Sequence, residues 1–555
     1  MNKKVCSFPI LFALLALVIG TCAVVFPASA QAAPTSTGSI TVSGTVASSY
    51  DAYQIFDANV IDGDSDAKIA TDLAWASDAV RDAALPVLHS AGMPKSQTTA
   101  QEAAEWLNAD SHLTSALSAQ LARSLQSSGA VSVALNAGKT AELPCGYWLI
   151  VADDDAISQG EAGTAPIMAL VGGSAVTVKP KAATPKVSKH VLEDSTAAWQ
   201  KAADATVADD LCWRLSATVP AGLTAYDTYM VQFVDTMSAG LDPSKVAASM
   251  RVYVAAGADG GFGAVSAGKD GRAGTEPAKG WTDITAQCAT KVAADGTFTV
   301  RTGDLIAALG GADAFAAGAR VVAVYNAPLN GACSHGIAKG NPNEVYLRYP
   351  RSPFADQSGD AGFTRTPSDD ACAYTWDLAL TKRGSDGDKP LAGAVLSITD
   401  DRGRTLAADG TWDADGKATV TTGGDGRVTV SGVDSGKLEV RELKAPKGYA
   451  AFEGTRSVTV KAEGLDVDQV AAAKPKLTIT AESPLRADSA DGSTGSLEAS
   501  LINTPTGTPP SITTGGFMPS TGDMAMYAAA AAAVAGAALI VVALLVKRGG
   551  GSHKE

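Results

Sequence analysis

The distribution of apolar and polar positions predicts a mainly β chain with one helical segment. The stretches "GSITVSGTV" (38–46) and "GRVTVSGV" (426–433) alternate apolar and polar residues, which is the period of a strand with one buried face. Between about 96 and 126, apolar residues instead recur at helical spacing. Short strands separated by Gly and Asp turns follow, as is typical of Ig-like β-sandwiches. We therefore expect an α+β first domain followed by tandem Ig-like β-sandwich domains.

Turn-rich and Pro-rich segments divide this pattern into successive parts. The expected parts are a signal peptide (1–30), an N-terminal domain (31–180), a central Ig-like domain (181–365), a C-terminal Ig-like domain (366–507), a linker (508–517) and a terminal segment (518–555). The linker "TPTGTPPSITTGG" is rich in Pro, Thr and Gly, a composition that favours an extended, accessible chain.

Both ends of the chain have the pattern of targeting segments. Lys3 and Lys4 precede an apolar run and a small-residue site that ends at Ala30, which predicts a secretory signal peptide. Residues 525–546 carry no charge and are long enough for a transmembrane helix, and basic residues follow from Lys547 onward. The sequence therefore predicts that the domains lie outside the cell and that the tail lies in the cytoplasm.

Charge and cysteine content narrow the classes of function. The chain has 58 acidic and 44 basic side chains, a net charge of −14, which argues against a nucleic-acid partner. Without a C-x-x-C pair, a His cluster or a Ser/His/Asp order, we expect no metal, no cofactor and no enzyme acting on other molecules. Five cysteines follow the signal peptide, an odd number whose disulfide pairing the sequence leaves open: Cys145, Cys212, Cys288, Cys333 and Cys372.

The terminal segment begins with a short motif that precedes the apolar run. "MPSTG", followed by a membrane span and basic tail, resembles the LPxTG sorting signal of Gram-positive surface proteins, with Met518 in place of Leu. In that family a membrane transpeptidase, sortase, cleaves between Thr and Gly and passes the new carbonyl end to an amine. The resemblance implies cleavage between Thr521 and Gly522, with Pro519 and Ser520 completing the motif.

A candidate amine lies at the first domain boundary. The stretch "AVTVKPKAATP" resembles the pilin motif of sortase-assembled pili, in which a Pro-Lys pair follows an alternating strand. Lys181 matches the acceptor lysine of that motif. Lys179 stands where the family often has Tyr or Asn, and it is an alternative acceptor.

The C-terminal region resembles the CnaB-type domains of such pilins. "LEVRELKAPKGY" is similar to their E-box and places Glu442 at the family's catalytic position. Lys382 in "LALTKRG" and Asn503 in "SLINTP" match the lysine and asparagine on the first and last strands. In that family the two side chains condense spontaneously into an isopeptide bond and release ammonia.

The central region resembles the same family less completely. Lys189 in "PKVSKHV" and Asp235 in "QFVDTMSAGL" match the family's lysine and catalytic acid. The family's acceptor Asn after the last-strand Tyr is absent, because Pro350 follows Tyr349. Asn341 and Asn343 remain alternative acceptors, and whether this bond forms is left open.

Together these motifs resemble the major shaft pilins of Gram-positive sortase-assembled fimbriae. The resemblance implies a structural subunit that is joined head to tail to identical copies and anchored to the cell wall. It also implies partners: pilin-class and housekeeping sortases, minor pilins, peptidoglycan and a host receptor. The alternative is a wall-anchored monomeric adhesin in which the CnaB modules form a stalk.

Overall fold

The computed structural model describes most of the chain between its two terminal segments. The described residues are 36–507 except 65–66, 110–111, 164, 182–183, 208 and 264–276. The predicted signal peptide, the motif at 518–522 and the predicted span at 525–546 lie outside them. Within the described ranges, no helix combines the length and apolar character needed to cross a membrane.

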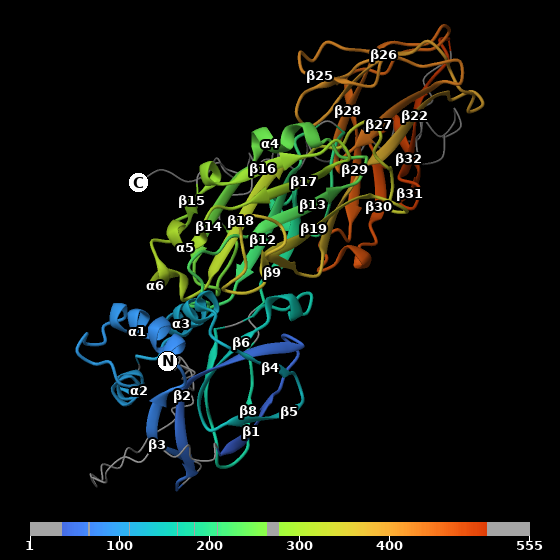
Figure 1. The fold of residues 1–555 in the computed structure, drawn as a ribbon. Coiled ribbons are helices and arrows are strands. Elements are labelled where there is room, and N and C mark those ends of the chain that lie inside the picture. The colour runs from blue at the N-terminus through green and yellow to red at the C-terminus, as the bar shows by residue number, and fades with distance from the viewer. Residues whose placement is uncertain are drawn as a thin grey trace, which may run out of the picture.

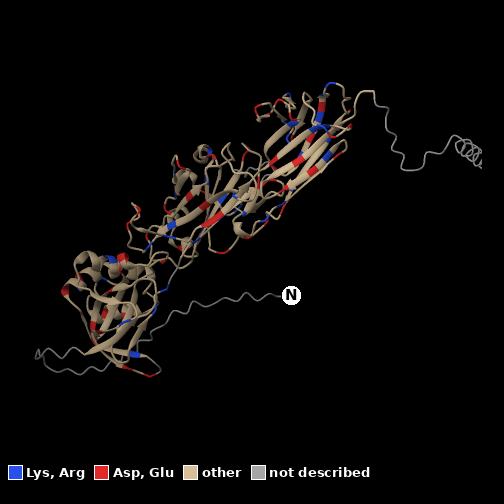
Figure 2. Ribbon diagram, turned by 90° about the vertical axis from the view of Figure 1, so that its right-hand side faces the viewer, with Lys and Arg blue, Asp and Glu red and all other residues tan. Residues whose placement is uncertain are grey.

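Three β-rich parts lie in a row and form an elongated molecule (Figure 1). The view turned by 90° shows the same succession, with acidic and basic residues distributed along it (Figure 2). The fold is therefore mainly β, with several sandwich-like domains in series.

The N-terminal part combines two sheets with three helices. One sheet has the order β3-β2-β6-β7 with β4 beside β2, and the other has the order β5-β1-β8. Its strands are β1 (Thr37–Val42), β2 (Ser49–Asp62), β3 (Lys68–Trp75), β4 (Val133–Asn136), β5 (Thr140–Pro144), β6 (Gly146–Ala152), β7 (Ile167–Val171) and β8 (Val176–Val178). Apolar residues fill the space between the two sheets, and a second cluster packs the helices onto the larger sheet.

The helices differ from the single segment expected between 96 and 126. They are α1 (Asp78–Ser90), α2 (Ala100–Asn108) and α3 (Ser115–Ser128). The backbone turns to an extended conformation at Ala109, and Thr114 then caps α3 by accepting a hydrogen bond from the Leu117 N–H. The sequence pattern did not predict α1, which contains Pro86.

The central part is a sandwich of two large sheets. One has the order β10-β9-β12-β18-β14-β15 and the other β11-β21-β19-β13-β17-β16, with β20 beside β19. Its strands are β9 (Lys186–Glu193), β10 (Ala198–Gln200), β11 (Ala202–Asp204), β12 (Cys212–Val219), β13 (Gln232–Met237), β14 (Arg251–Ala256), β15 (Thr282–Asp283), β16 (Ala289–Val292), β17 (Thr297–Arg301), β18 (Ala319–Asn326), β19 (Asn341–Pro350), β20 (Phe363–Arg365) and β21 (Asp369–Tyr374). Short helices α4 (Val246–Ser249), α5 (Leu305–Ala308) and α6 (Ala312–Phe315) lie in its connections. Between the sheets lies the largest apolar core of the described residues.

The C-terminal part is a second, smaller sandwich. Its sheets have the orders β27-β22-β32-β31 and β25-β24-β23-β28-β29-β30, with β26 beside β23. Its strands are β22 (Trp376–Gly384), β23 (Val395–Thr399), β24 (Thr405–Leu406), β25 (Trp412–Asp413), β26 (Val420–Thr421), β27 (Arg427–Val433), β28 (Gly436–Lys444), β29 (Thr455–Glu463), β30 (Lys476–Ala481), β31 (Leu485–Asp491) and β32 (Ser496–Asn503). Its first and last strands, β22 and β32, lie side by side and run parallel.

One strand lies in a different part from the one the sequence pattern suggests. The sequence places 366–507 in the C-terminal domain, yet β21 pairs with β19 and β11 in a central sheet. Ala371 and Ala373 of β21 are fully buried in the central core. The structural change from one sandwich to the next therefore comes at Thr375, between β21 and β22.

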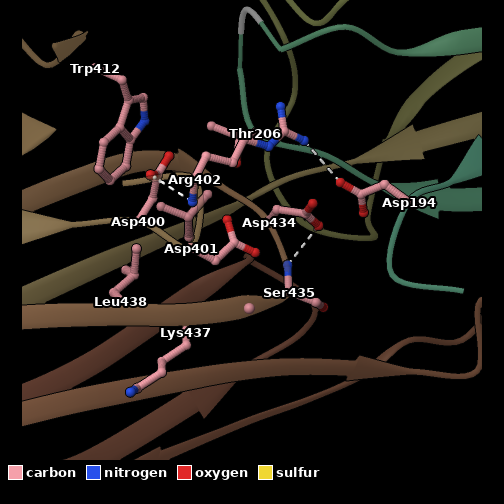
Figure 3. Close-up of a pocket in the computed structure, with 12 residues that line it drawn as sticks. Asp194, Thr206, Asp400, Asp401, Arg402, Trp412, Asp434, Ser435, Lys437 and Leu438 are labelled. Carbon is pink, nitrogen blue, oxygen red and sulfur yellow. Dashed lines mark hydrogen bonds and ion pairs between the residues drawn. The ribbon is translucent and has the colours of Figure 1, made fainter. Parts of the chain in front are cut away.

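Side-chain hydrogen bonds connect the central and C-terminal parts. One carboxylate oxygen of Asp204 accepts from the Trp376 indole N–H at 2.6 Å and from the backbone N–H and hydroxyl of Ser435 at 3.0 and 2.5 Å. The Asp204 bonds join the end of β11 to the start of β22 and to the turn before β28. Arg402 also forms an ion pair with Asp194 at 3.0 Å, which joins the turn after β9 to the loop between β23 and β24. Figure 3 marks this contact with a dashed line.

The same junction gathers several carboxyl groups. Glu193 accepts hydrogen bonds from the Ser195 backbone and hydroxyl and from the Asp204 N–H. Burial and the nearby charge of Asp204 raise the pKa of Glu193 to about 7. Burial also raises the pKa of Asp194 and Asp434. The junction therefore favours protonated carboxyl groups.

Candidate cross-linking sites

The parallel pairing of β22 and β32 brings Lys382 and Asn503 to one face of their sheet. Lys382 pairs with Leu501, and Asn503 lies two residues further along β32, so both side chains point into the core. Glu442 reaches this site from β28 in the facing sheet. The three side chains are buried, with exposed fractions of 0, 2 and 6% for Lys382, Asn503 and Glu442.

In the C-terminal site, the Asn503 amide is hydrogen-bonded to the Glu442 carboxyl group. The Asn503 Nδ2 donates to both Glu442 oxygens at 2.9 Å, while its Oδ1 is buried without a hydrogen-bond partner. The Lys382 Nζ lies 3.9 Å from Glu442 Oε1 and donates to the Leu501 carbonyl at 3.1 Å. Burial lowers the pKa of Lys382 to about 8, against the opposing effect of Glu442.

The central site assembles across the two sheets of its sandwich. Lys189 comes from β9 in one sheet, and Asp235 and Asn343 come from neighbouring strands β13 and β19 in the other. Asn343 pairs with Met237, two residues from Asp235, so these two side chains share the inner face. Lys189, Asp235 and Asn343 are all fully buried.

A tyrosine that the sequence analysis did not single out lies at the centre of this group. The Tyr325 hydroxyl accepts from Lys189 Nζ at 3.0 Å and from Asn343 Nδ2 at 2.9 Å, and it donates to Asp235 Oδ2 at 3.2 Å. Lys189 Nζ also forms an ion pair with Asp235. Tyr325 stands in the strand "ARVVAVYN", where alternation predicts a core aromatic and offers no sign of a polar role.

Burial brings the pKa values of Lys189 and Asp235, the two titrating groups of the central site, closer together. It lowers the pKa of Lys189 to about 8 and raises the pKa of Asp235 to about 6, although each group's charge opposes the effect on the other. The Oδ1 atoms of Asp235 and Asn343 are buried, and neither has a hydrogen-bond partner among the described residues. A proton on the carboxyl group would supply the donor that such atoms require.

The structure distinguishes the two acceptors that the sequence left open. Asn341 accepts from the Ser334 N–H at 2.8 Å and donates to the carbonyls of Ser334 and Ala373 at 2.9 and 3.1 Å. Its amide therefore holds the loop before β19. Asn343 is the asparagine that lies with Tyr325 and the acid.

The other predicted residues fall into two groups. Lys179 and Lys181 both follow β8 and are exposed, so each presents its amine to solvent. Met518, Pro519, Ser520, Thr521 and Gly522 lie outside the described residues. Of the cysteines, Cys145, Cys212 and Cys372 are buried, and Cys288 and Cys333 are half-buried.

The N-terminal part offers a contrast to both sites. Its buried Lys68 donates to the carbonyl and hydroxyl oxygens of Ser174 at 2.7 and 3.1 Å and to the carbonyl of Gly172. Its acidic contact, Asp62, is half-exposed. Lys68 therefore ties loops together through hydrogen bonds, and among the described residues its polar contacts are Asp62, Gly172 and Ser174 rather than an asparagine.

Comparisons with known proteins match parts of the chain. Residues 377–474 match the model of the SpaA prealbumin-like fold domain, a range that holds Lys382 and Glu442 and ends before Asn503. The trypsin-resistant surface T6 protein of Streptococcus pyogenes serotype M6 is 30% identical over 143 residues. That alignment covers 24% of each chain, so the chain aligns with about a quarter of this relative's length.

The solved structures that match the chain include two pilins. The T6 backbone pilin of S. pyogenes serotype M6 covers 85% of this chain and 98% of its own, at 16% identity and a TM-score of 0.45. The major pilin SpaD of Corynebacterium diphtheriae gives the same coverage and identity with a TM-score of 0.41.

The sequence comparisons confirm the predicted resemblance to the backbone pilins of Gram-positive bacteria. The domain match contains the lysine and acid of the C-terminal site, which were identified from the sequence as CnaB-type residues. Residues 377–474 of this chain are thus similar to the SpaA prealbumin-like fold domain.

Proposed function

We propose that the chain is the repeating structural subunit of a covalently polymerised cell-surface pilus, and that its domains form their own isopeptide bonds. One observation carries this proposal: two successive sandwich domains each bury a lysine, an acid and an asparagine together. Burying three such polar groups is costly unless they bond to one another, so their repetition in series favours a shared chemical purpose.

In the C-terminal domain, the neutral Lys382 amine attacks the Asn503 Cγ. A new Nζ–Cγ bond forms, the Cγ–Nδ2 bond breaks, and the amide nitrogen leaves as ammonia. Glu442 in its protonated form donates to the amide carbonyl and then carries a proton from the amine to the leaving nitrogen. Exchange of Asn503 Oδ1 and Nδ2 by rotation of the amide gives the unpartnered Oδ1 this donor.

In the central domain, the same reaction joins Lys189 to Asn343 with Asp235 as the acid. Proton transfer from Lys189 to Asp235 must precede attack. Burial lowers the pKa of Lys189 and raises the pKa of Asp235, so this transfer costs less than it would between two exposed groups. Burial therefore favours the activated amine, and Tyr325 holds the three groups together.

Polymerisation would use the exposed amine of Lys181 and the carbonyl of Thr521 from another copy. A pilin sortase would join them, and a housekeeping sortase would attach the finished polymer to peptidoglycan. Load would then enter the chain at Lys181 and leave at Thr521, so that it passes through the central and C-terminal domains. Such a subunit would be a sortase substrate on the cell surface, with minor pilins and a host receptor as further partners, and would act as no enzyme on other molecules.

Two measurements test the proposal. Intact mass of the secreted chain should fall by about 17 Da for each bond, because each condensation releases ammonia. Asn343→Ala should remove the central bond, whereas the matched Asn341→Ala should retain it. A wild-type mass with neither loss would refute the self-linking domains.

Polymerisation is tested separately on whole cells. Lys181→Ala should abolish the high-mass ladder on denaturing gels, and Lys179→Ala should leave it. A single anchored species in the wild type would favour the monomeric adhesin instead.

A further inference from the structure

On one side of strand β9, the neighbouring strand ends just before it reaches Lys189, the residue with the central amine. It pairs with β12 on one side and with β10 on the other, but β10 ends at Gln200, opposite Val191. The chain then crosses to the other sheet as β11. The backbone N–H and C=O of Lys189 consequently bond to side chains on the side that β10 has left. A buried strand without such partners would be penalised.

Two side chains of opposite charge take the place of the missing strand. Asp369 Oδ2 accepts from the Lys189 N–H at 2.7 Å, and Lys201 Nζ donates to the Lys189 carbonyl at 2.8 Å. Lys201 and Asp369 also form an ion pair with each other. Lys201 further donates to the Asp370 carbonyl at 3.2 Å. Asp369 and Lys201 therefore form a closed ring of contacts with the backbone N–H and C=O of Lys189 in β9.

We propose that Lys201 and Asp369 are positioning residues for the central cross-link, which hold the main chain of Lys189 so that its amine meets Asp235 and Asn343. This inference rests on the proposed isopeptide chemistry and adds to it. At this site the two side chains contact the backbone and each other, and the reacting atoms lie outside these contacts. Their role follows from the length of the Lys189 side chain. Because a lysine side chain is long and flexible, its amine is confined only if its backbone is confined.

The pair also balances charge at the site. The charged or titratable groups that face the Lys189 amine are Asp235, Tyr325, Asp369 and Lys201. After burial and Asp235, the charge of Asp369 raises the pKa of Lys189 and the charge of Lys201 lowers it. Removal of Lys201 alone would leave Asp369 uncompensated, favour the ammonium form and move bond formation to higher pH.

The test follows the two bonds separately as the chain matures. The full chain is made by cell-free synthesis, quenched at intervals and digested, and the branched peptides Lys189–Asn343 and Lys382–Asn503 are measured by mass spectrometry. Lys201→Met should slow the central bond about 10- to 100-fold and displace its pH profile upward. The C-terminal bond in the same molecule should be unchanged. Lys201→Arg should recover much of the rate, and Lys291→Met, an exposed lysine on β16, should match the wild type.

Each outcome decides a different question. A wild-type rate and pH profile for Lys201→Met would overturn the positioning role. Absence of the Lys189–Asn343 peptide from the wild type, with Lys382–Asn503 present, would refute the central reaction itself. If proteolysis shows that Lys201→Met leaves the central domain unfolded, Asp369→Asn decides, because it keeps an oxygen for the Lys189 N–H and loses the ion pair. A slower bond in a protease-resistant Asp369→Asn domain supports the role, and an unchanged rate overturns it.

Discussion

The central and C-terminal sites contain the same three chemical groups in opposite arrangements. In the central domain, the acid and the asparagine share one sheet and the lysine comes from the other. In the C-terminal domain, the lysine and the asparagine share one sheet and the acid crosses the core. The proposed central bond would therefore tie two sheets together, whereas the C-terminal bond would tie two parallel neighbours.

This difference changes what each bond protects. Asn503 ends β32, so a bond to Lys382 passes load from the start of the domain directly to its exit. Asn343 stands near the start of β19, and β20 and β21 still follow it before the next domain. In the central domain, load beyond Asn343 must pass through β19, which hydrogen-bonds to β21 and β13. If both proposed bonds form, their placement would give the two domains different mechanical behaviour although the chemistry is the same.

The largest expected effect is the loss of either bond. Lys382→Met and Lys189→Met should each lower the free energy of unfolding of their domain by about 5 kcal/mol, because the closed loops span about 120 and about 150 residues. Denaturant titration with intact mass on each variant checks this. An unchanged midpoint for one variant would show that only the other domain is cross-linked.

Shortening the acid should affect the C-terminal site next. Glu442 reaches Asn503 from the opposite sheet, so Glu442→Asp withdraws the carboxyl group and should slow that bond about 100-fold, or about 2.7 kcal/mol in barrier. The rate of appearance of the Lys382–Asn503 peptide measures the effect, and the central bond is the control. A wild-type rate would show that the acid's span across the core is unimportant.

The next prediction concerns the pH dependence of stability at the junction between the two domains. The free energy of unfolding should change by about 2 to 3 kcal/mol with pH. Because the folded-state pKa of Glu193 is raised to about 7, the unfolded chain binds fewer protons than the folded one between about pH 4.5 and 7, and stability falls as pH rises through that window. Glu193→Gln should flatten this slope in thermal unfolding. Glu344→Gln, an exposed change on β19, serves as the control. A slope that persists in Glu193→Gln would assign the effect to another group.

The smallest expected effect concerns Tyr325, for which the described C-terminal site has no counterpart. Tyr325→Phe removes the hydroxyl that Lys189 and Asn343 share, and should slow the central bond about tenfold, or about 1.4 kcal/mol. The C-terminal bond should keep its rate. Equal rates of the central bond in the variant and the wild type would reduce Tyr325 to a packing role.

The sequence predicted the C-terminal site more fully than the central one, because all three of its residues match the motifs of CnaB-type domains. That resemblance identified Lys382, Glu442 and Asn503, and the structure brings them together. The choice of Asn343 over Asn341 depends on which amide the neighbouring loop occupies, which no local pattern records. Tyr325 resembles any core aromatic until its partners from other strands are in place.

The fold shows the same limit at its boundaries. Tandem mainly β domains could be expected from period and turns, yet the helical segment divides at Ala109 and β21 completes the central sheet. The place of β21 depends on tertiary packing, since this strand pairs with β11, far away in the sequence. The sequence analysis did not predict a role for Lys201 and Asp369 either, because each resembles an ordinary surface charge. Only the structure shows that β10 ends beside them and that they take its place next to Lys189.

The carboxylate of Asp204 has a consequence for the flexibility of the proposed fibre. Its three hydrogen bonds to Trp376 and Ser435 act beside the ion pairs that Arg402 and Arg404 form with Asp194 and Asp209, and each such bond contributes about 1 to 3 kcal/mol. Tilting one domain against the next would break several of these bonds together, at a cost well above thermal energy. The resulting thread would resist bending as well as stretching, a combination that would hold a surface appendage away from the cell in flowing liquid.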